Sequence, residues 1–410
     1  MDAARLVRTL NNLNRFGYAD AGMTRLAYSP VERQAVAYFS GLCEREGMTV
    51  RYDPCGNLIA RREGRHPELP VVAMGSHLDT VVRGGRYDGV LGVAAALEVV
   101  RSLNDRRLTT DHPVEIIVFA CEESSRFGVS TIGSKAMAGL LDKSSLAVLK
   151  DRAGLTLAEA ISQCGLDFDG IGRCARGKEE IKAFFELHIE QGPILENEGK
   201  PIGIVTGIAA PTRYEVTVWG RASHSGTTPM NGRRDAFLGA AEISLGLEAA
   251  AKTDVAYGTV ATVGACEVKP GAMNVIPDTA ELKLEIRGTS VESKSRVSER
   301  LFEVIRKIEK TRGLAITVKE LSDELPTALD GETTESLCRL CEREGVSYLR
   351  MTSGAGHDAM NMARLCPTGL VFVPSHAGIS HCRDEYTSAE QIVSGASLLE
   401  LAVRKWACSS

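Results

Sequence analysis

Short, strongly apolar runs alternate with helical segments along most of the chain, and this alternation constrains the fold more than any other feature. Residues Val114 to Ala120 are apolar on both faces of a strand, as is typical of a parallel sheet covered by helices. Leu69 to Gly75 is another candidate for a buried strand, and Gly89 to Leu103 has apolar residues at helical spacing. The pattern predicts an α/β domain with a mixed, largely parallel sheet and helices on both faces. Its other predicted elements are strands at Ala183–Ile189 and Gly369–Val373 and a closing helix at Ser388–Trp406.

Between residues 213 and 325 the pattern changes to alternating strands and amphipathic helices. The predicted order, β-α-β-β-α-β, is typical of the split βαβ sandwich. Its elements are expected at Tyr214–Trp219, Arg234–Ala251, Tyr257–Val268, Thr279–Arg287 and Val291–Arg312. We therefore predict a main domain in two parts, residues 1–212 and 326–410, interrupted by a smaller α+β domain at 213–325.

Charge and cysteine usage exclude several classes of protein. The chain has 48 Lys and Arg against 53 Asp and Glu, so it lacks the basic excess expected of a nucleic-acid partner. The 11 cysteines are scattered without the spacing of a disulfide framework, which indicates a reducing compartment. Neither a signal peptide nor an apolar run of roughly 18 residues is found. We expect a cytoplasmic protein with no membrane or nucleic-acid partner.

Polar clusters follow the predicted strands, where α/β sheets bind ligands. In the run from Gly75 to Thr80, His77 could bind a metal and Asp79 could fix its orientation, because a ligating imidazole needs its second nitrogen held. Asp88, at the start of the next helix, could be a further ligand or a bridge between two ions. The alternative is that Asp88 only caps that helix.

Adjacent carboxylates, Glu122 and Glu123, follow the apolar strand that ends at Ala120. Two such groups repel each other unless a cation or a proton lies between them. One could bind a metal while the other acts as the base that activates a water. A solvated acidic turn is the alternative interpretation.

Histidines complete the pattern in four more polar segments, at His188, His224, His357 and His381. A single histidine of this kind is more often a surface or core residue. Together with the paired glutamates, however, they favour a metal site, and a His/carboxylate set without thiolate motifs suits zinc or manganese, with two ions sharing Asp88. The C-x-x-C pair Cys338 and Cys341 is instead interpreted as one face of a helix.

Over almost its whole length the chain resembles the amidase branch of the M20 metallohydrolases, which includes N-carbamoyl-L-amino acid hydrolases, allantoate amidohydrolases and β-ureidopropionases. The motifs that carry the resemblance are Gly75–Thr80, Gly85–Gly89, Glu122–Phe127, Glu186–Gly192, His224–Met230 with Arg233–Asp235, Asn274–Pro277, Ser353–Asp358 and Gly378–His381.

The resemblance implies that Asp88 bridges two divalent metal ions (Zn, Mn, Co or Ni). His77 and His188 would complete one metal position, and Glu123 and His381 the other. Glu122 would be the general base, and Asp79 would orient His77. The residues implied on the substrate side are His224 for the oxyanion, Asn274 and Arg287 for a carboxylate, Gln191 for a ureido group, and Gly356 and His357.

The activity implied is cleavage of the carbamoyl C–N bond of N-carbamoyl-L-amino acids to amino acid, ammonia and carbon dioxide. Allantoate amidohydrolase is the near alternative, followed by β-ureidopropionase and, more distantly, a peptidase or aminoacylase. A non-catalytic binding protein would require loss of Glu122 or of a ligand, and none is lost. The partner would be a small ureido carboxylate. The resemblance also implies a homodimer through the inserted domain, acting as a lid, while His376 in the segment Pro374–Ala377 has no assigned role.

Overall fold

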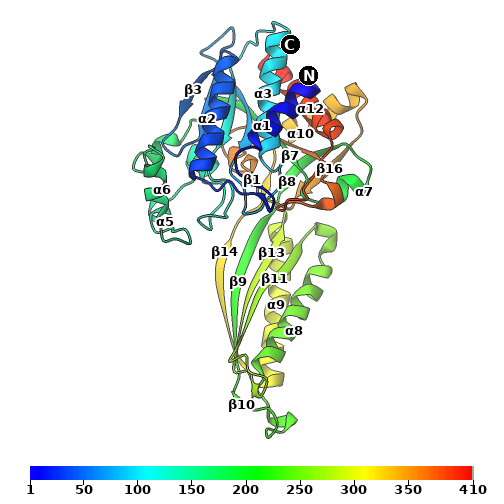
Figure 1. Cartoon of the computed structure of the whole chain (residues 1–410). Coiled ribbons are helices and arrows are strands. Elements are labelled where there is room, and N and C mark those ends of the chain that lie inside the picture. The colour runs from blue at the N-terminus through cyan, green and yellow to red at the C-terminus, as the bar shows by residue number, and fades with distance from the viewer. Residues whose placement is uncertain (409–410) are drawn as a thin grey trace. The chain divides into compact units, whose positions relative to one another are not determined.

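The computed structural model describes residues 1–408, and these divide into two compact units (Figure 1). The second unit comprises Gly207–Ala328 together with Gly354–Gly356, and the first comprises the rest of the described chain. The second unit begins six residues before and ends three residues after the predicted bounds of 213 and 325. The second unit starts in the last two residues of β8 (Ile202–Ile208) and includes all of β9 (Ala210–Trp219), which begins four residues before the alternating pattern at Tyr214.

A mixed sheet with the strand order β15-β8-β17-β7-β5-β6-β4-β3 forms the centre of the first unit, and β16 also pairs with β8. The four central strands β17, β7, β5 and β6 are parallel, while β8, β4 and β3 join antiparallel. Every residue of β5 and β6 is buried, as expected for strands covered on both faces. The strand bounds are β3 Thr49–Tyr52, β4 Leu58–Arg62, β5 Val71–His77, β6 Val114–Phe119, β7 Ile181–Ile189, β8 Ile202–Ile208, β15 Thr327–Ala328, β16 Tyr348–Ser353 and β17 Thr368–Val373.

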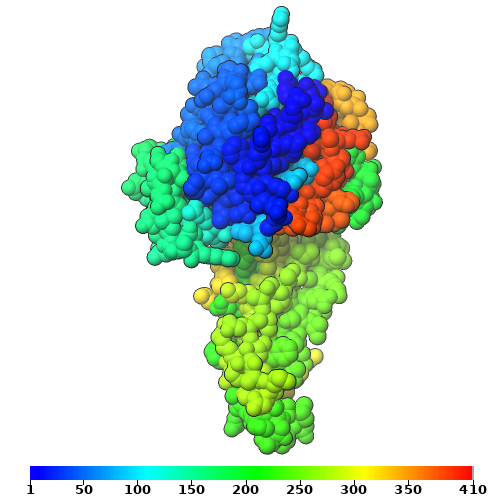
Figure 2. Space-filling view, viewed as in Figure 1, coloured from blue at the N-terminus to red at the C-terminus, as the bar shows by residue number. Residues whose placement is uncertain are grey.

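Long helices cover one face of this sheet in a single apolar cluster. Residues of α1 (Ala3–Leu13), α2 (Pro30–Arg45), α3 (Val90–Asp105), α10 (Gly331–Glu344) and α12 (Ala389–Ala407) pack there against alternate residues of β5 and β7. α1 and α12 are in contact, and Figure 2 shows the two ends of the chain side by side on the surface of this unit. The shorter helices are α4 Ile132–Met137, α5 Lys143–Ala147, α6 Leu157–Gln163, α7 Ile194–Asn197 and α11 Ala359–Met362. Among these, α4 contacts β6, and α11 contacts β7 and β17.

The second unit is an antiparallel four-stranded sheet with two helices on one face. Its strand order is β11-β13-β9-β14, and its apolar core lies between the sheet and the helices α8 and α9. The bounds are β9 Ala210–Trp219, α8 Ala236–Lys252, β11 Val260–Lys269, β13 Thr279–Gly288, α9 Val291–Arg312 and β14 Ala315–Asp323. A short ladder between β10 (Ser223–His224) and β12 (Val275–Ile276) lies beyond this sheet. Across residues 1–408 no helix combines the length and apolarity that crossing a bilayer requires.

Candidate metal centre

The carboxyl ends of the parallel strands bring the predicted polar clusters of the first unit together. β5 ends at His77 beside Phe119 of β6, and β7 and β17 end in register at Ile189 and Val373. Parallel strands end at the same edge of a sheet, so the segments that follow them share one site. His77, Glu122, His188 and His381 reach this edge from four different strands or the loops after them.

His77, Asp88 and His188 form a first group of possible ligands, with their donor atoms within 4.8 Å of one another. One carboxylate oxygen of Asp88, Oδ1, lies 3.1 Å from His188 Nε2 and 3.5 Å from His77 Nε2. All three residues are buried.

Asp88, Glu123 and His381 form the second group. Here the other oxygen of Asp88, Oδ2, lies 3.0 Å from His381 Nε2, and His381 Nε2 lies 3.6 Å from Glu123 Oε1. The His381 side chain is half exposed, so this group opens to solvent. Because Asp88 presents one oxygen to each group, the geometry suits a carboxylate shared by two ions.

Asp79 acts on this site in a different way from the one predicted. The backbone carbonyl of Asp79, rather than its carboxylate, lies 2.9 Å from His77 Nδ1, while the carboxylate is 3.7 Å from that nitrogen. The carboxylate instead accepts the backbone N–H groups of Glu122 at 3.1 Å and Glu123 at 3.0 Å. Asp79 therefore fixes His77 through its main chain and the glutamate pair through its side chain.

The ligand types and charges of the cluster fit divalent cations. Burial and the nearby Asp88 raise the pKa of Glu123 to about 7, and burial raises the pKa of Glu122 well above its usual value. Hydrogen bonding to Asp88 raises the pKa of His381 to about 9. Without a cation, protons must therefore offset the mutual repulsion of the carboxylates, and a bound dication relieves the same repulsion. Imidazole nitrogen and carboxylate oxygen, the only donors present in the two groups, suit zinc or manganese.

Glu122 lies beside the first group without belonging to either. Its Oε2 atom is 3.8 Å from His77 Nε2, and the side chain is largely buried. A carboxyl whose pKa is raised by burial is suited to exchanging protons near neutral pH.

A third set of possible ligands, Glu186, His188 and His357, lies deeper in the sheet. Both carboxylate oxygens of Glu186 already accept hydrogen bonds, from Ser76 Oγ at 2.7 Å and from the backbone N–H of Ala359 at 2.9 Å. His357 is buried within 3.0 Å of Ser353 Oγ, and burial lowers its pKa well below the usual value. These partners favour a structural role for Glu186, because both of its carboxylate oxygens are occupied.

Gln191 lies against the ligands. Its Nε2 atom donates to Asp88 Oδ2 at 2.8 Å and to Ser380 Oγ at 3.2 Å, and it lies 3.2 Å from His381 Nε2. The residue has a positive φ of 59°, and its backbone N–H donates to Ser375 Oγ. The side-chain amide of Gln191 is thus held where it would contact a small molecule bound at the second ligand group.

The second unit contains His224, Asn274, Arg287 and Gly356, but the structure does not bring them all together. His224 pairs with Val275 across the β10–β12 ladder, next to Asn274. Arg287 is near the other end of β13, eight residues beyond Thr279, which is roughly 26 Å along a strand. Its guanidinium donates to Glu285 at 2.9 Å and to the carbonyl of Gly354, two residues before Gly356, at 2.8 Å.

Sequence reasoning missed two buried residues that hold this site. Arg25 is fully buried and donates to the backbone carbonyls of Leu78 at 2.5 Å, Leu13 at 2.9 Å and Phe16 at 2.8 Å. It thereby fixes the segment between His77 and Asp79. Glu385 accepts hydrogen bonds from the backbone N–H groups of Asp88 and His381. Neither residue lies in a recognisable local pattern, although Glu385 follows His381 by only four residues.

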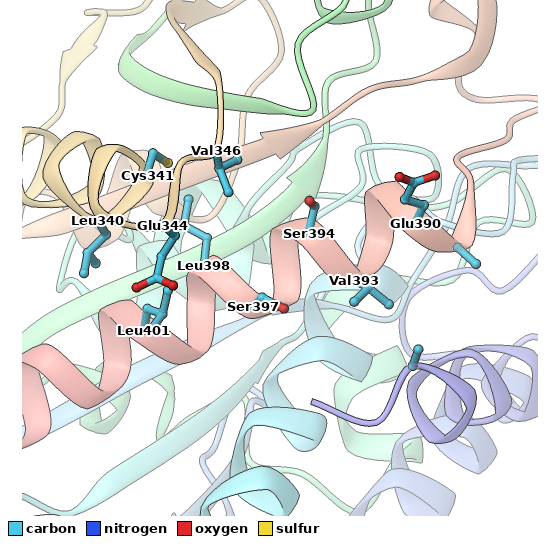
Figure 3. A pocket seen from close by; sticks show the side chains of 12 residues that line it. Leu340, Cys341, Glu344, Val346, Glu390, Val393, Ser394, Ser397, Leu398 and Leu401 are labelled. Carbon is cyan, nitrogen blue, oxygen red and sulfur yellow. The ribbon is translucent and has the colours of Figure 1, made fainter.

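An apolar cavity of about 560 Å³ lies elsewhere in the first unit, along α10 and α12 (Figure 3). Leu340, Val346, Leu398 and Leu401 line it, with Glu344 and Glu390 among its few polar residues. It contains no histidine and none of the residues of the two ligand groups, so it is separate from the polar cluster.

Comparisons with known proteins converge on one family. The family described as peptidase family M20/M25/M40 matches residues 73–405. An uncharacterized hydrolase of Haemophilus influenzae is 46% identical, with 93% of this chain and 92% of the relative covered. An N-carbamoyl-L-amino acid amidohydrolase of Geobacillus stearothermophilus is 39% identical, with 96% of both chains covered.

Two further matches extend this picture. An allantoate amidohydrolase of Escherichia coli K12 is 36% identical, with 96% of this chain and 95% of the relative covered. The crystal structure of an amidase of the hydantoinase/carbamoylase family from Burkholderia multivorans superposes with a TM-score of 0.92 at 35% identity, covering 100% of this chain and 98% of that one.

Proposed function

Because the chain belongs to the peptidase family M20/M25/M40, and its relatives include several N-carbamoyl-L-amino acid amidohydrolases, we propose that it hydrolyses the carbamoyl C–N bond of N-carbamoyl-L-amino acids. Hydrolysis of this bond gives one amine and a carbamate, and the carbamate then loses carbon dioxide, so that the final products would be the amino acid, ammonia and carbon dioxide. The observation that carries the proposal is the pair of ligand groups that share Asp88, with the carboxyl of Glu122, which belongs to neither group, beside them.

His77, His188 and Asp88 would hold one divalent ion, and Asp88, Glu123 and His381 a second, with Zn, Mn, Co or Ni as candidates. Ions held there would supply Lewis-acid activation of the substrate carbonyl and of the attacking water. Asp79 keeps the backbone of Glu122 and Glu123 in place, and therefore aligns both the base and a ligand.

Glu122 would accept a proton from the attacking water and return it to the leaving nitrogen. Its position beside His77 keeps it within reach of the ligand groups, and its burial favours the protonated form needed in the second step. Gln191, already held against Asp88 and His381, would bind the ureido group.

His224, Asn274, Arg287, Gly356 and His357 would bind the remainder of the substrate, with Arg287 exchanging Glu285 for the substrate carboxylate. The separation of His224 and Asn274 from Arg287 within one second unit supports a homodimer in which each lid serves two sites. The edge strand β11 pairs only with β13, and Phe237, Leu238 and Leu245 of α8 are exposed, so this unit has an edge and an apolar surface suited to a second copy.

Allantoate is the second candidate substrate, favoured by the allantoate amidohydrolase among the relatives. It also presents a carboxylate beside a ureido group. β-Ureidopropionase activity is the third candidate, and peptidase or aminoacylase activity is the most distant alternative. We propose a cytoplasmic enzyme, since the 11 cysteines are all free, and one that acts on a small molecule without nucleic acid or membrane.

A panel of ammonia-release assays tests the function. The panel compares N-carbamoyl-L-amino acids, N-carbamoyl-β-alanine and allantoate, with a dipeptide scored by amine release. We expect the highest kcat/KM for an N-carbamoyl-L-amino acid, abolition by a chelator, and recovery on adding Mn, Co, Ni or Zn. Preference for allantoate would select the second candidate, and activity indifferent to chelation would overturn the metal-dependent mechanism.

A further inference from the structure

Glu385 is a buried carboxylate in the segment between β17 and α12, and it belongs to neither ligand group. Only 3% of its surface is exposed. A carboxylate removed from water in this way needs hydrogen bonds to both oxygens. In Glu385 these bonds go to two segments that are far apart in the sequence, and each segment carries a ligand.

The first oxygen binds the segment that carries the shared ligand. Glu385 Oε1 accepts the backbone N–H of Tyr87 at 2.8 Å and that of Asp88 at 3.1 Å. The main chain that aims the Asp88 carboxylate is therefore fixed by a residue almost 300 positions further along the chain.

The second oxygen binds the segment that carries His381. Glu385 Oε2 accepts the hydroxyl of Ser380 at 2.7 Å and the backbone N–H of His381 at 3.4 Å. Ser380 in turn accepts the side-chain amide of Gln191. One carboxylate thus joins the segments of two of the three residues in the second group.

The loop that carries Asp88 also packs closely against Glu385 at Gly85. A Cβ atom added to Gly85 would lie 2.1 Å from the carboxylate carbon of Glu385. The loop before Asp88 therefore packs its bare backbone directly on the carboxylate. This contact gives a physical reason for glycine at position 85.

We propose that Glu385 is a positioning residue for the second metal position, and that it makes occupancy of this position depend on the link between the Asp88 and His381 segments. The inference rests on the proposed two-ion function, since it concerns the ion that Asp88, Glu123 and His381 would hold. The first position depends less on Glu385, because His77 and His188 are carried by β5 and β7.

Glu385→Gln is the informative substitution. It preserves shape but leaves one acceptor oxygen where the carboxylate offers two, and it turns an NH2 group toward a backbone N–H. Glu400→Gln is the matched control, because Glu400 is also a buried carboxylate of the first unit that accepts a serine hydroxyl, from Ser102 at 3.0 Å, but it lies in α12 outside both ligand groups.

The experiment is a titration of the chelator-treated full-length protein with Co²⁺ and Zn²⁺, followed by calorimetry and by the visible spectrum of cobalt. We expect two ions per subunit in the wild type and in Glu400→Gln. In Glu385→Gln we expect the Kd of one ion to rise roughly 10- to 100-fold while the other changes less than about threefold. His381→Ala should weaken the same ion, and adding Glu385→Gln to it should cause little further loss.

Several outcomes would overturn the proposal. If Glu385→Gln bound both ions with wild-type affinity, the proposal would be wrong. Equal weakening of both ions would also overturn it, because that result indicates a general loss of structure. If Glu385→Gln does not fold, Gly85→Ala replaces it, because an added Cβ displaces the loop from the carboxylate without changing charge. We expect Gly85→Ala to weaken the same ion selectively. Wild-type binding of both ions by Gly85→Ala would overturn the proposal. A wild type that binds fewer than two ions would instead contradict the proposed function, and this inference with it.

Discussion

Asp88 has the most consequential position of any single residue, because its two oxygens face different ligand groups. The sequence left two interpretations of this residue open, a helix cap and a bridge. In the structure the N-cap of α3 is Gly89, and no side chain caps that helix, so the carboxylate is available for the ligand groups. The histidines around it hold the pKa of Asp88 well below its usual range despite burial, so it remains an anion.

Local motifs pointed to the residues of both ligand groups, which the structure brings together at the carboxyl ends of the parallel strands. They were not enough to assign the partners of those residues. The carboxylate of Asp79 binds the glutamate backbone rather than His77, and Arg25 and Glu385 act through hydrogen bonds across 53 and 297 residues of sequence. Such contacts leave no periodic or compositional trace, because they depend on which loops the finished sheet brings together.

Glu122→Gln tests the proposed role of Glu122 as the general base. The substitution keeps the shape and the backbone hydrogen bond to Asp79 but removes proton transfer, so we expect kcat to fall by at least about 100-fold with metal content unchanged. Ammonia release and elemental analysis of the same preparation provide the measurement. A variant that kept near-normal kcat would rule out Glu122 as the base, and loss of metal would point to Glu122 as a ligand.

Among the elements, those with a strong apolar pattern were predicted well. The strand predicted at Val114–Ala120 is β6 at Val114–Phe119, and the helix predicted at Gly89–Leu103 is α3 at Val90–Asp105. The strand predicted from Leu69 begins at Val71, after Pro70, which has no N–H to donate to the sheet. The α/β class with a mixed sheet is therefore confirmed.

The outer antiparallel strands β3 and β4 were not predicted. β3 is largely exposed, and β4 ends in Arg61 and Arg62, so neither has the continuous apolar run of a central strand. Their pairing is set by β6, to which β4 is hydrogen-bonded. Tertiary context, rather than local sequence, decides such elements.

The end of β5 depends on Arg25, which gives a stability prediction. Arg25→Lys keeps a positive charge but cannot reach three carbonyls with a planar fork, so we expect a loss of roughly 2–4 kcal/mol in the free energy of unfolding. Arg343→Lys is the control, since Arg343 is exposed and pairs with its exposed neighbour Glu344, and a loss under about 1 kcal/mol is expected. Urea unfolding monitored by circular dichroism measures both, and equal losses would contradict the clamp role of Arg25.

Glu32, in the first turn of α2, gives a pH dependence. Burial raises its pKa to about 7, and one carboxylate oxygen has no hydrogen-bond partner. Because the folded pKa lies above the unfolded one, the stability contribution is complete below about pH 4 and is lost as the pH rises through 7. Glu32→Gln should therefore be more stable than the wild type at pH 8, by on the order of 2 kcal/mol, and similar to it near pH 4. Unfolding curves at both pH values test this, and an unchanged difference between them would contradict it.

The positions of His224, Asn274 and Arg287 within the second unit bear on how the proposed substrate site is completed. His224 and Asn274 lie at one end of this unit and Arg287 lies toward the other, so one copy does not present all three to one small substrate. The strand predicted at Thr279–Arg287 already implied that Arg287 lies a strand length away from Asn274. That separation follows from the ten-residue length of β13.

Mixed dimers test whether a lid serves the partner's site. Glu122→Gln and His224→Ala chains, each inactive alone, are refolded together or co-expressed. If His224 acts across the dimer, one of the two sites in each hybrid has both residues intact, and about a quarter of wild-type activity is expected from a statistical mixture. No recovery in hybrids shown to have formed would mean that His224 acts within its own chain.

The long segment of the second unit, residues 207–328, begins and ends in two strands that pair with each other. Ile208 lies opposite Thr327, and Gly207 lies opposite Ala328. The chain therefore leaves and re-enters the main sheet at points one strand spacing apart, roughly 4.8 Å. Because these ends are so close, we expect that residues 207–328, which carry most of the proposed substrate-binding residues, can be replaced as one segment while the proposed metal ligands, all outside it, stay in place.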